Sequence, residues 1–434
     1  MLYDDRTALR IIYNIPFGTN RHPQTKQGDI FFALKGPSFN GNTFAQQALE
    51  SGAAYAIVDE KEFITGPKTI WVEDVLTNLQ QLARYHRQQF NNLPQSRKVP
   101  FIAITGSNGK TTTKELVHAV LSTSFKTYTT KGNLNNHIGI PLTLLGVKTD
   151  AEMVVIEMGA NHQKEIEGYC KYTLPTHGVI TNCGKAHLEG FGGVEGVRKG
   201  KGELYDYLRN HEGTAFVMWD YDYLQTMSKG IREVITYGTK EADYIGNILQ
   251  SEPFLRVYIE KGASIKEICT QIVGEYNLPN VVVAVAIGKY FNIADEKIKK
   301  AIEEYVPTNS RSQLVTSGTN QIVLDAYNAN PSSMRAAIEN FAKMHSPNKV
   351  VMLGAMAELG TESLEEHQAI IDLLTNFSWK EVVLVGGDFQ KIAHPFTGLN
   401  NVAEAAEWFR NKQFQHTAIL IKGSRSMQME KVLA

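Results

Sequence analysis

The sequence lacks the features that would mark a membrane, secreted or zinc-binding protein. Its longest apolar run, residues 281–287, is far shorter than the roughly 20 apolar residues that span a bilayer. The amino terminus, MLYDDRTALR, is acidic early and has no apolar signal core. The three cysteines, Cys170, Cys183 and Cys269, are isolated and odd in number, which argues against a zinc motif and a disulfide framework. We therefore expect a cytoplasmic protein without membrane insertion, whose cysteines are ordinary buried thiols.

The sequence also lacks an excess of charge of either sign. Lys and Arg number 44 against 45 acidic residues, so the net charge of -1 argues against broad electrostatic binding to nucleic acid. Apolar residues make up 43% and charged residues 21%, an ordinary balance for a soluble globular protein. A chain of 434 residues is too long for one core, so two to four domains are expected.

Apolar segments before residue 96 predict a small mixed α/β domain. Strands are expected at residues 30–34 and 53–58, and helices at residues 43–51 and 75–90. A polar linker, residues 91–98, follows the second helix and contains a proline and a serine. We place the first domain boundary there, so that the amino-terminal domain covers residues 1–96.

Alternating short strands and helices predict parallel sheets in the rest of the chain. A helix rich in Lys and Glu, residues 296–305, ends just before a second boundary near residues 307–311. We expect a central phosphate-loop ATPase domain with a parallel sheet at 97–308, and a smaller Rossmann-like domain at 309–434. The predicted strands are residues 101–104, 153–156, 178–181 and 214–218 in the central domain, and 322–324, 350–353, 382–385 and 418–421 in the last.

The segment 102–112, IAITGSNGKTT, carries the strongest single signal. An apolar strand runs into a glycine turn, and a helix is expected from about Thr111. Gly106 and Gly109 let backbone N–H groups point at phosphate oxygens, while Lys110 would reach the β- and γ-phosphates and the Thr111 hydroxyl would bind Mg²⁺. The glycines enclose two residues rather than the usual four, and a plain Gly-Asn turn with a solvated Lys110 is the alternative. Strand, loop and helix together favour ATP binding, but the loop does not choose between kinase, hydrolase and ligase.

Three further polar residues are candidates for metal binding. Glu157 follows the apolar strand 153–156, where parallel sheets carry metal and phosphate ligands, although a helix cap or a surface charge is the alternative. His187 follows strand 178–181 and is either a ligand or a satisfied polar residue. Lys201 opens a helical segment. Mg²⁺ would repel its ammonium group, so Lys201 either lies away from the metal or is carbamylated. The sequence leaves both alternatives open.

Several motifs together resemble the Mur ligase family, and within it the branch that adds D-alanyl-D-alanine to UDP-N-acetylmuramoyl-tripeptide. The resemblance covers nearly the whole chain. It rests on residues 105–112 (TGSNGKTT), 132–145 (GNLNNHIGIPLTLL), 327–335 (YNANPSSMR) and 422–426 (KGSRS). It implies ATP-dependent amide ligation through an acyl phosphate, which yields the UDP-MurNAc-pentapeptide precursor of the bacterial cell wall and releases ADP and phosphate.

The resemblance also implies roles for individual residues. Lys110 would stabilise the transferring phosphoryl group, Thr111 and Glu157 would hold one Mg²⁺, and His187 with a carbamylated Lys201 would hold a second. Asn277 and Asn280 would contact adenine, Arg311 the phosphates and Asp325 the ribose, beside the phosphate-loop residues Gly106, Ser107, Asn108, Gly109, Lys110, Thr111 and Thr112. The residues expected to bind the other substrates are Arg21, Asn133, Asn135, Asn136, Tyr327, Asn328 and Asn330. Arg21 belongs to the UDP-sugar end, and the last three line the dipeptide cleft.

The sequence departs from the family pattern at several positions. Tyr276 stands where the family has a histidine, so that contact would become stacking. Leu324 and Ala355 each replace an acidic residue. These changes concern nucleotide and substrate contacts and spare the phosphate loop, Glu157, His187 and Lys201.

Alternative functions remain at this stage. A sister ligase adding another amino acid, or one extending folate with glutamate, is disfavoured by the motif at 327–331, and three scattered cysteines exclude an amidating relative with a zinc insert. Two alternatives are not amide ligases: a catalytically dead nucleotide-binding module and a phosphate-loop kinase. We expect a monomer that acts on small molecules; whether its tripeptide ends in diaminopimelate or lysine is not encoded in the sequence.

Overall fold

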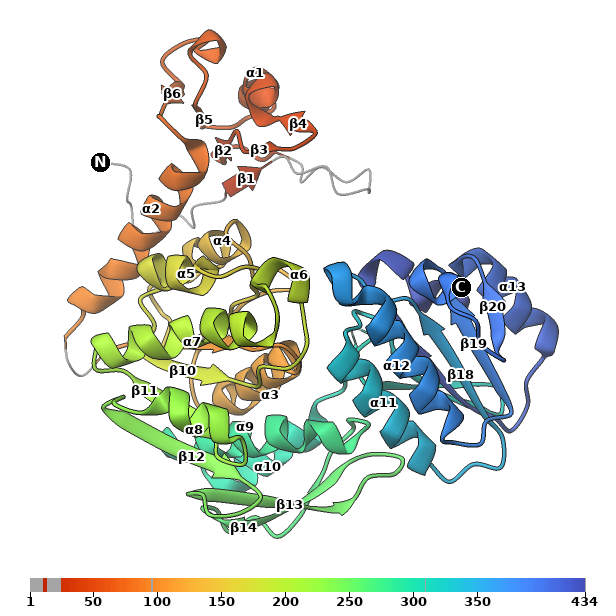
Figure 1. The fold of residues 1–434 in the computed structure, drawn as a ribbon. Coiled ribbons are helices and arrows are strands. Elements are labelled where there is room, and N and C mark those ends of the chain that lie inside the picture. The colour runs from red at the N-terminus through yellow and green to blue at the C-terminus, as the bar shows by residue number, and fades with distance from the viewer. Residues whose placement is uncertain (1–10, 14–24, 95–96, 309, 434) are drawn as a thin grey trace. The chain divides into compact units, whose positions relative to one another are not determined.

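The computed structural model describes residues 25–94, 97–308 and 310–433, and the backbone alone of residues 11–13 (Figure 1). Internal contacts divide the chain into two compact units. The first comprises residues 1–102, 126–158 and 167–175, and the second residues 103–125, 159–166 and 176–434. The fold class is α/β, as predicted.

A four-stranded parallel sheet begins the first unit. Its order is β1 (Ile11–Tyr13), β2 (Ile30–Phe32), β5 (Tyr55–Val58) and β6 (Thr69–Trp71). A small antiparallel pair, β3 (Lys35–Gly36) and β4 (Phe39–Asn40), leads to the 3-10 helix η1 (Gly41–Phe44) and helix α1 (Ala45–Glu50), and a further 3-10 helix, η2 (Lys61–Phe63), follows β5. The strands predicted at 30–34 and 53–58 and the helix predicted at 43–51 are confirmed, with ends that differ by at most two residues.

Helix α2 (Val75–Gln89) is fixed at both ends. Asp74 caps its start by accepting a hydrogen bond from the Thr77 N–H at 2.6 Å. Near its end the fully buried Arg87 donates to the carbonyls of Thr173 and Leu174, each at 2.9 Å, and its guanidinium lies 3.7 Å from the ring centroid of Phe101. These bonds tie α2 to the loop after α5 (Glu165–Thr173). The helix also packs against α4 (Gly139–Leu145), and a 3-10 helix, η3 (Phe90–Asn92), follows it.

A nine-stranded sheet contains the predicted central strands. Its order is β15 (Ile268–Cys269), β14 (Arg256–Lys261), β13 (Tyr244–Gln250), β12 (Glu233–Gly238), β11 (Thr214–Met218), β10 (His177–Ile180), β7 (Phe101–Thr105), β9 (Met153–Glu157) and β8 (Thr127–Thr129). Strands β10 to β13 pair in parallel, whereas β13, β14 and β15 are antiparallel. The antiparallel part was not predicted, because only one residue of β13 is buried and the strand contains no apolar run.

Helices cover both faces of this sheet within the second unit. Helices α3 (Lys110–Ser122), α9 (Leu278–Tyr290) and α10 (Asp295–Glu304) pack together, and the 3-10 helix η5 (Glu275–Asn277) precedes α9. The apolar run 281–287 forms the buried middle of α9. Helix α7 (Val194–Asn210) packs on β10 and β11 beside α6 (Leu188–Phe191) and α8 (Asp222–Ser228).

The prediction that Lys201 opens a helix is wrong, because Lys201 lies in the middle of α7. This segment has a low helix propensity because it contains Gly196, Gly200 and Gly202, so the sequence did not indicate that the helix begins before Lys201. The structure uses two of them for close packing. A Cβ at Gly196 would lie 1.8 Å from the Phe191 carbonyl oxygen, and one at Gly200 would lie 2.4 Å from the Phe191 ring.

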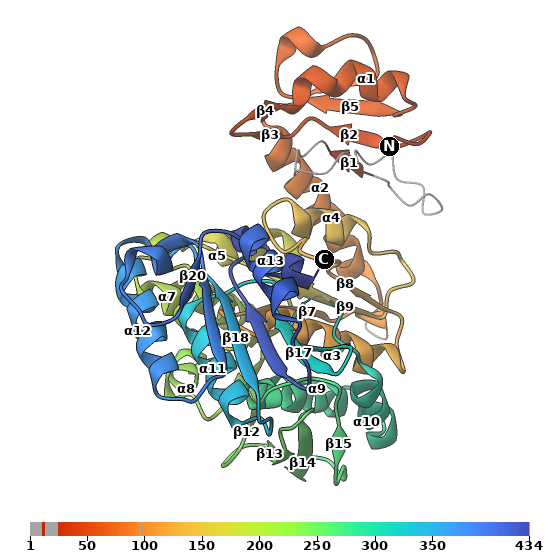
Figure 2. The ribbon, with the colours of Figure 1, turned by 90° about the vertical axis from the view of Figure 1, so that its right-hand side faces the viewer.

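A six-stranded sheet forms the last part of the second unit (Figure 2). Its order is β16 (Gln313–Ser317), β17 (Asn320–Asp325), β21 (Ala418–Lys422), β18 (Lys349–Gly354), β19 (Glu381–Val385) and β20 (Thr397–Leu399), parallel except for β16. The helices of this part are α11 (Pro331–Lys343), α12 (Ser363–Thr375) and α13 (Val402–Lys412), with the 3-10 helices η6 (Gly360–Glu362), η7 (Gly387–Lys391), η8 (Arg425–Met427) and η9 (Met429–Leu433). Ile322, Val350 and Ile419 pack with Ala405 of α13, while their neighbours along the strands are buried too. Burial on both faces explains the continuous apolar runs.

The cysteines differ from the expectation at one position. Cys170 and Cys183 are buried, and burial raises the pKa of the Cys183 thiol to about 12. Cys269 is exposed, because it lies on the edge strand β15. In the described part of the chain, no helix combines the length and the hydrophobicity needed to cross a membrane.

His177 makes the stability of the second unit sensitive to acid. Its ring lies 5.5 Å from that of Tyr290 and 5.3 Å from that of Phe291, and burial lowers its pKa to about 4, against a smaller opposing effect of Glu233. The unfolded chain therefore binds more protons between pH 6.5 and 4, so stability falls as the pH drops through this range. We expect the free energy of unfolding to fall by about 2 kcal/mol more between pH 7 and pH 5 in the wild type than in His177→Phe.

Urea unfolding at both pH values measures this difference. His211→Gln, at an exposed histidine, should lose stability with acid as the wild type does. An equal loss in His177→Phe would contradict the assignment to His177.

Candidate active site

The phosphate loop lies between β7 and α3, in the strand–glycine–helix arrangement that the sequence predicted. Gly106 has φ +140° and Gly109 has φ +81°, values that L side chains rarely adopt. A Cβ at Gly106 would lie 2.0 Å from the Thr181 hydroxyl, and one at Gly109 would lie 2.7 Å from the Asn280 side-chain oxygen. Both backbone conformation and crowding therefore require glycine at these positions.

The segment after β10 holds this loop in place. The Ser107 N–H donates to the Asn182 carbonyl at 2.8 Å, and the Asn108 N–H donates to the Asn182 side chain at 3.1 Å. The Thr181 hydroxyl donates to the Asn108 carbonyl at 2.6 Å, and the Ser107 hydroxyl donates to the Gly184 carbonyl at 2.9 Å. Sequence reasoning assigned no role to Thr181 and Asn182. Their place directly after a buried strand was the signal that could have found them.

Replacing Gly106 by alanine should damage the loop. The new methyl group would displace Thr181 and impose a strained φ, so we expect the free energy of unfolding to fall by about 1–3 kcal/mol and nucleotide binding to weaken. Gly168→Ala, in the middle of α5 where an added Cβ meets nothing within 4 Å, is the matched control. It should be neutral or slightly stabilising. Unfolding and ATP titrations test both, and unchanged ATP affinity in Gly106→Ala would contradict the expectation.

The first residues of α3 present both charge and unsatisfied hydrogen-bonding capacity. The Lys110 ammonium donates to the Gly106 carbonyl at 2.6 Å and to the Ser107 carbonyl at 3.1 Å, so its charge lies over the loop. The Thr111 hydroxyl oxygen is buried and has no hydrogen-bond partner among the described residues, and Thr112 is buried as well. A positive charge beside a helix N-terminus suits a polyphosphate.

Glu157, in the first unit, is buried at the end of β9. One carboxylate oxygen accepts a 2.7 Å hydrogen bond from the Asn135 side chain, and within the described ranges the other has no partner. A buried, partnerless carboxylate oxygen costs free energy unless a cation binds it, so Glu157 fits the oxygen donors that Mg²⁺ prefers. Across the described residues, no three His, Cys, Asp or Glu side chains form a metal cluster.

The other predicted asparagines of the first unit shape the same segment. Asn136 accepts hydrogen bonds from the N–H groups of Ile138 at 3.2 Å and Gly139 at 2.8 Å, which fixes the start of α4. The Asn133 carbonyl accepts the Asn135 N–H at 2.8 Å. This turn aims Asn135 at Glu157.

Lys201 is buried in the middle of α7. Its amine donates to the Ala160 carbonyl at 2.8 Å and lies 4.8 Å from the ring centroid of Phe191. Burial, and secondly the charge of Lys110, hold the pKa of this amine well below its usual range. A buried amine without its proton is a nucleophile for carbon dioxide, so this site fits carbamylation.

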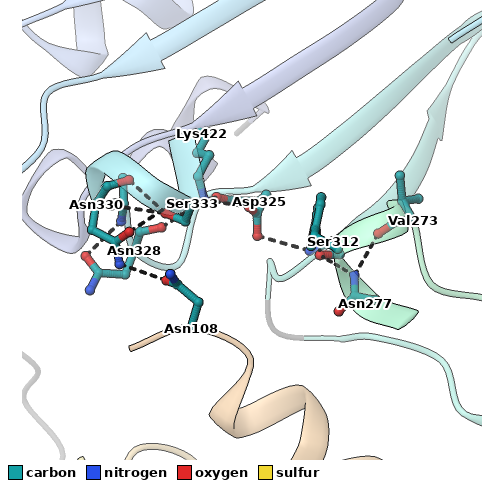
Figure 3. Close-up of polar contacts among 11 residues, drawn as sticks. Asn108, Val273, Asn277, Ser312, Asp325, Asn328, Asn330, Ser333 and Lys422 are labelled. Carbon is teal, nitrogen blue, oxygen red and sulfur yellow. Dashed lines mark hydrogen bonds and ion pairs between the residues drawn. The ribbon is translucent and has the colours of Figure 1, made fainter. Parts of the chain in front are cut away.

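A chain of polar contacts joins the predicted adenine-side and ribose-side residues (Figure 3). The Asn277 side-chain amide donates to the Val273 carbonyl at 2.8 Å and to the Ser312 hydroxyl at 3.3 Å, and Asn280 donates to the Asn277 side-chain oxygen at 2.8 Å. Thr113 of α3 donates to Asn280 at 3.0 Å. The asparagine pair is therefore tied to the helix that follows the phosphate loop.

Asp325 continues this chain of contacts (Figure 3). Its carboxylate accepts the Ser312 N–H at 3.1 Å and pairs with the Lys422 ammonium at 2.5 Å. Lys422, which is 2% exposed, also donates to the Asn328 carbonyl at 3.1 Å. Sequence reasoning noted Lys422 in a motif but gave it no role. Its place at the carboxyl end of the buried strand β21 was the available signal.

The residues predicted to line the dipeptide cleft lie around the start of α11. Asn330 caps this helix together with Ser333, and its side-chain amide donates to the Asn108 side chain of the phosphate loop at 2.8 Å. Asn328 accepts the Ala329 N–H at 2.9 Å through its side-chain oxygen.

Two cations lie close to Tyr327, the remaining residue predicted to line the dipeptide cleft. The guanidinium groups of Arg311 and Arg425 lie 3.7 Å and 5.7 Å from its ring centroid. The buried Arg311 Nε has no hydrogen-bond partner among the described residues.

Tyr276 and Arg21 were both expected to contact a substrate. The Tyr276 hydroxyl lies 3.0 Å from that of Ser312, within the same polar chain, and burial raises the pKa of this hydroxyl; its stacking on the nucleotide stays a prediction. Arg21 lies outside the described residues.

Comparison with known proteins decides the family. Residues 104–288 match the Mur ligase middle domain, and residues 310–425 match the Mur ligase glutamate ligase domain. The UDP-N-acetylmuramoyl-tripeptide–D-alanyl-D-alanine ligase of Bacillus subtilis is 32% identical over 94% of this chain and 90% of its own length. The chain belongs to the Mur ligase family. The Escherichia coli ligase of the same name is 34% identical over the same shares of the two chains.

Solved structures of Mur ligases share this fold. A crystal structure of MurF from Acinetobacter baumannii has a TM-score of 0.85 at 30% identity, covering 98% of this chain and 92% of that one. MurF ligase from Thermotoga maritima, solved in complex with ADP, has a TM-score of 0.86 at 25% identity, covering 98% and 96%. The Mur ligase fold therefore extends over nearly the whole chain.

Proposed function

We propose that this Mur ligase uses ATP to join D-alanyl-D-alanine to UDP-N-acetylmuramoyl-tripeptide, making the pentapeptide precursor of peptidoglycan. The main observation in support of the proposal is the phosphate loop at residues 105–112. The relatives with which this chain aligns are named for the same reaction. Residues 1–96 would bind the UDP-sugar, with Arg21 among them, 97–308 ATP, and 309–434 would complete the site. The enzyme would act as a monomer in the cytoplasm.

The reaction has two steps. The terminal carboxylate of the tripeptide attacks the γ-phosphorus of ATP, and an acyl phosphate and ADP result. The amine of the dipeptide then attacks the acyl carbon and loses a proton, and phosphate leaves. Holding the reactants in line contributes on the order of 7–11 kcal/mol to lowering the barrier.

The residues of this chain would supply charge and position for these steps. Lys110 and the N–H groups at the start of α3 would neutralise the phosphates. Thr111 and Glu157 would hold one Mg²⁺, and His187 with the carbamate of Lys201 a second. The chemistry these ions supply is neutralisation of a carboxylate and a phosphate that repel each other.

The remaining cleft would bind the nucleotide and the incoming amine. Asn277, Asn280 and Asp325 form one polar chain with Ser312 and would face the nucleoside. Arg311 would contact the phosphates. Tyr327, Asn328 and Asn330 surround the start of α11, close to the phosphate loop, where the dipeptide amine must arrive.

Phosphate release tests the proposal. The assay contains ATP, Mg²⁺, UDP-N-acetylmuramoyl-tripeptide and D-alanyl-D-alanine, and each component is omitted in turn. Release that needs all four, with a pentapeptide product by mass, supports the function. Release that ignores D-alanyl-D-alanine but responds to another amine would instead identify a sister ligase, and ATP binding without release would identify a dead module.

A further inference from the structure

A hydrogen bond joins the side chains of His187 and Glu358, although the backbone of each residue adopts a conformation that is unfavourable for it. His187 Nδ1 contacts a carboxylate oxygen of Glu358 in the loop after β18. Both residues have left-handed backbone conformations, with φ +53° and φ +61°. Such conformations cost about 1–3 kcal/mol each away from glycine and cluster at functional sites.

The loop that carries Glu358 is fixed from behind. The buried His367 accepts the Met356 N–H at 3.0 Å through Nε2 and donates to the Ser363 carbonyl at 2.7 Å through Nδ1. The Ser424 hydroxyl donates to the Ala355 carbonyl at 2.6 Å. Glu358 therefore extends from a loop whose course does not depend on its own side chain.

The segment that carries His187 is bound by the same part of the second unit. The Glu189 N–H donates to the Glu358 carbonyl at 3.4 Å, and a Cβ at Gly360 would lie 3.1 Å from that of Glu189. The Lys185 N–H donates to the Ser332 hydroxyl at 2.9 Å, and the Lys185 ammonium pairs with the buried Glu366. The contact between His187 and Glu358 is thus one of several that fix the two segments against each other.

The chemistry of the pair decides which histidine nitrogen remains available. A carboxylate only accepts hydrogen bonds, so His187 Nδ1 carries the proton. In the neutral ring, Nε2 then keeps its lone pair. A carboxylate that holds a histidine in this way orients the ring and makes the other nitrogen a better metal ligand.

We propose that Glu358 is a positioning residue for the metal site, which fixes the tautomer and the ring orientation of His187 so that Nε2 can bind a divalent cation. This rests on the proposed role of His187 as a metal ligand. Glu358 is about half exposed, with 51% of its side chain accessible, so the pair contributes little to stability. A purely structural role and a positioning role therefore predict different results.

Mn²⁺ binding, followed by electron paramagnetic resonance in the presence of a non-hydrolysable ATP analogue, tests the proposal on the full chain. Glu358→Ala should weaken Mn²⁺ binding about tenfold or more, with an unchanged thermal midpoint. Glu358→Gln keeps an acceptor for Nδ1–H and should recover part of the affinity. Glu365→Ala, at an exposed carboxylate of α12, should bind Mn²⁺ as the wild type does.

Nitrogen-15 spectra of the histidine rings give a second readout, with His187→Gln to assign the signal. The wild type should show His187 protonated at Nδ1, and Glu358→Ala should shift it toward the Nε2–H tautomer. Unchanged or tighter Mn²⁺ binding in Glu358→Ala, while His187→Gln weakens it, would overturn the role of Glu358 alone. Unchanged Mn²⁺ binding in His187→Gln would overturn the metal role of His187 and this proposal with it.

Discussion

Replacing Lys110 by alanine is expected to slow acyl phosphate formation by about 10³-fold or more. The ammonium group lies over the phosphate loop, where it donates to the Gly106 and Ser107 carbonyls, and the proposed function assigns it to the transferring phosphoryl group. Alanine is a good helix former at the first position of α3, so the fold should persist. Rapid-quench measurement of single-turnover acyl phosphate or ADP formation gives the rate, and thermal unfolding reports the fold.

Two further variants sharpen this test. Lys110→Arg keeps the charge but not the compact ammonium, so it should restore little activity. Lys148→Ala, at an exposed lysine, should behave as the wild type does. Near-normal turnover in Lys110→Ala would refute the assigned role.

Replacing Lys201 by methionine is expected to lower turnover by about 10²-fold or more, because the second cation would lose a ligand. The side chain is fully buried, and its amine makes one described hydrogen bond, to the Ala160 carbonyl. Methionine has a similar volume and no polar group to bury, so the thermal midpoint should hold or rise.

Carbon-13 spectroscopy tests the carbamate directly. Wild-type protein equilibrated with ¹³C-bicarbonate should show a carbamate carbon that Lys201→Met lacks. Lys199→Met, two positions away on the exposed side of α7, should keep both the signal and the activity. A fully active wild type without a carbamate signal would rule out the modification.

The sequence by itself determined the class of fold and the identity of the phosphate loop. Apolar runs such as residues 214–218 and 418–421 became strands that are buried on both faces of their sheets, which is why their side chains do not alternate between apolar and polar. The loop could be recognised because its two glycines, its lysine and its threonine all lie within residues 106–111, so their chemistry needs no distant contact. The motifs also placed the chain among the Mur ligases before any contact was known.

Only the tertiary structure decided which distant side chains meet. The strand ends that carry Asn182 and Lys422 are visible in the sequence, but their partners are not, and Ser312 and Glu358 have no local signal. Each of the four acts through a partner more than 10 residues away. The glycines of α7 suggested a broken helix, but the packing of Phe191 against them outweighed their low propensity. The sequence could not predict the low pKa of the Lys201 amine either. Its main cause is burial, which depends on the packing of the whole fold.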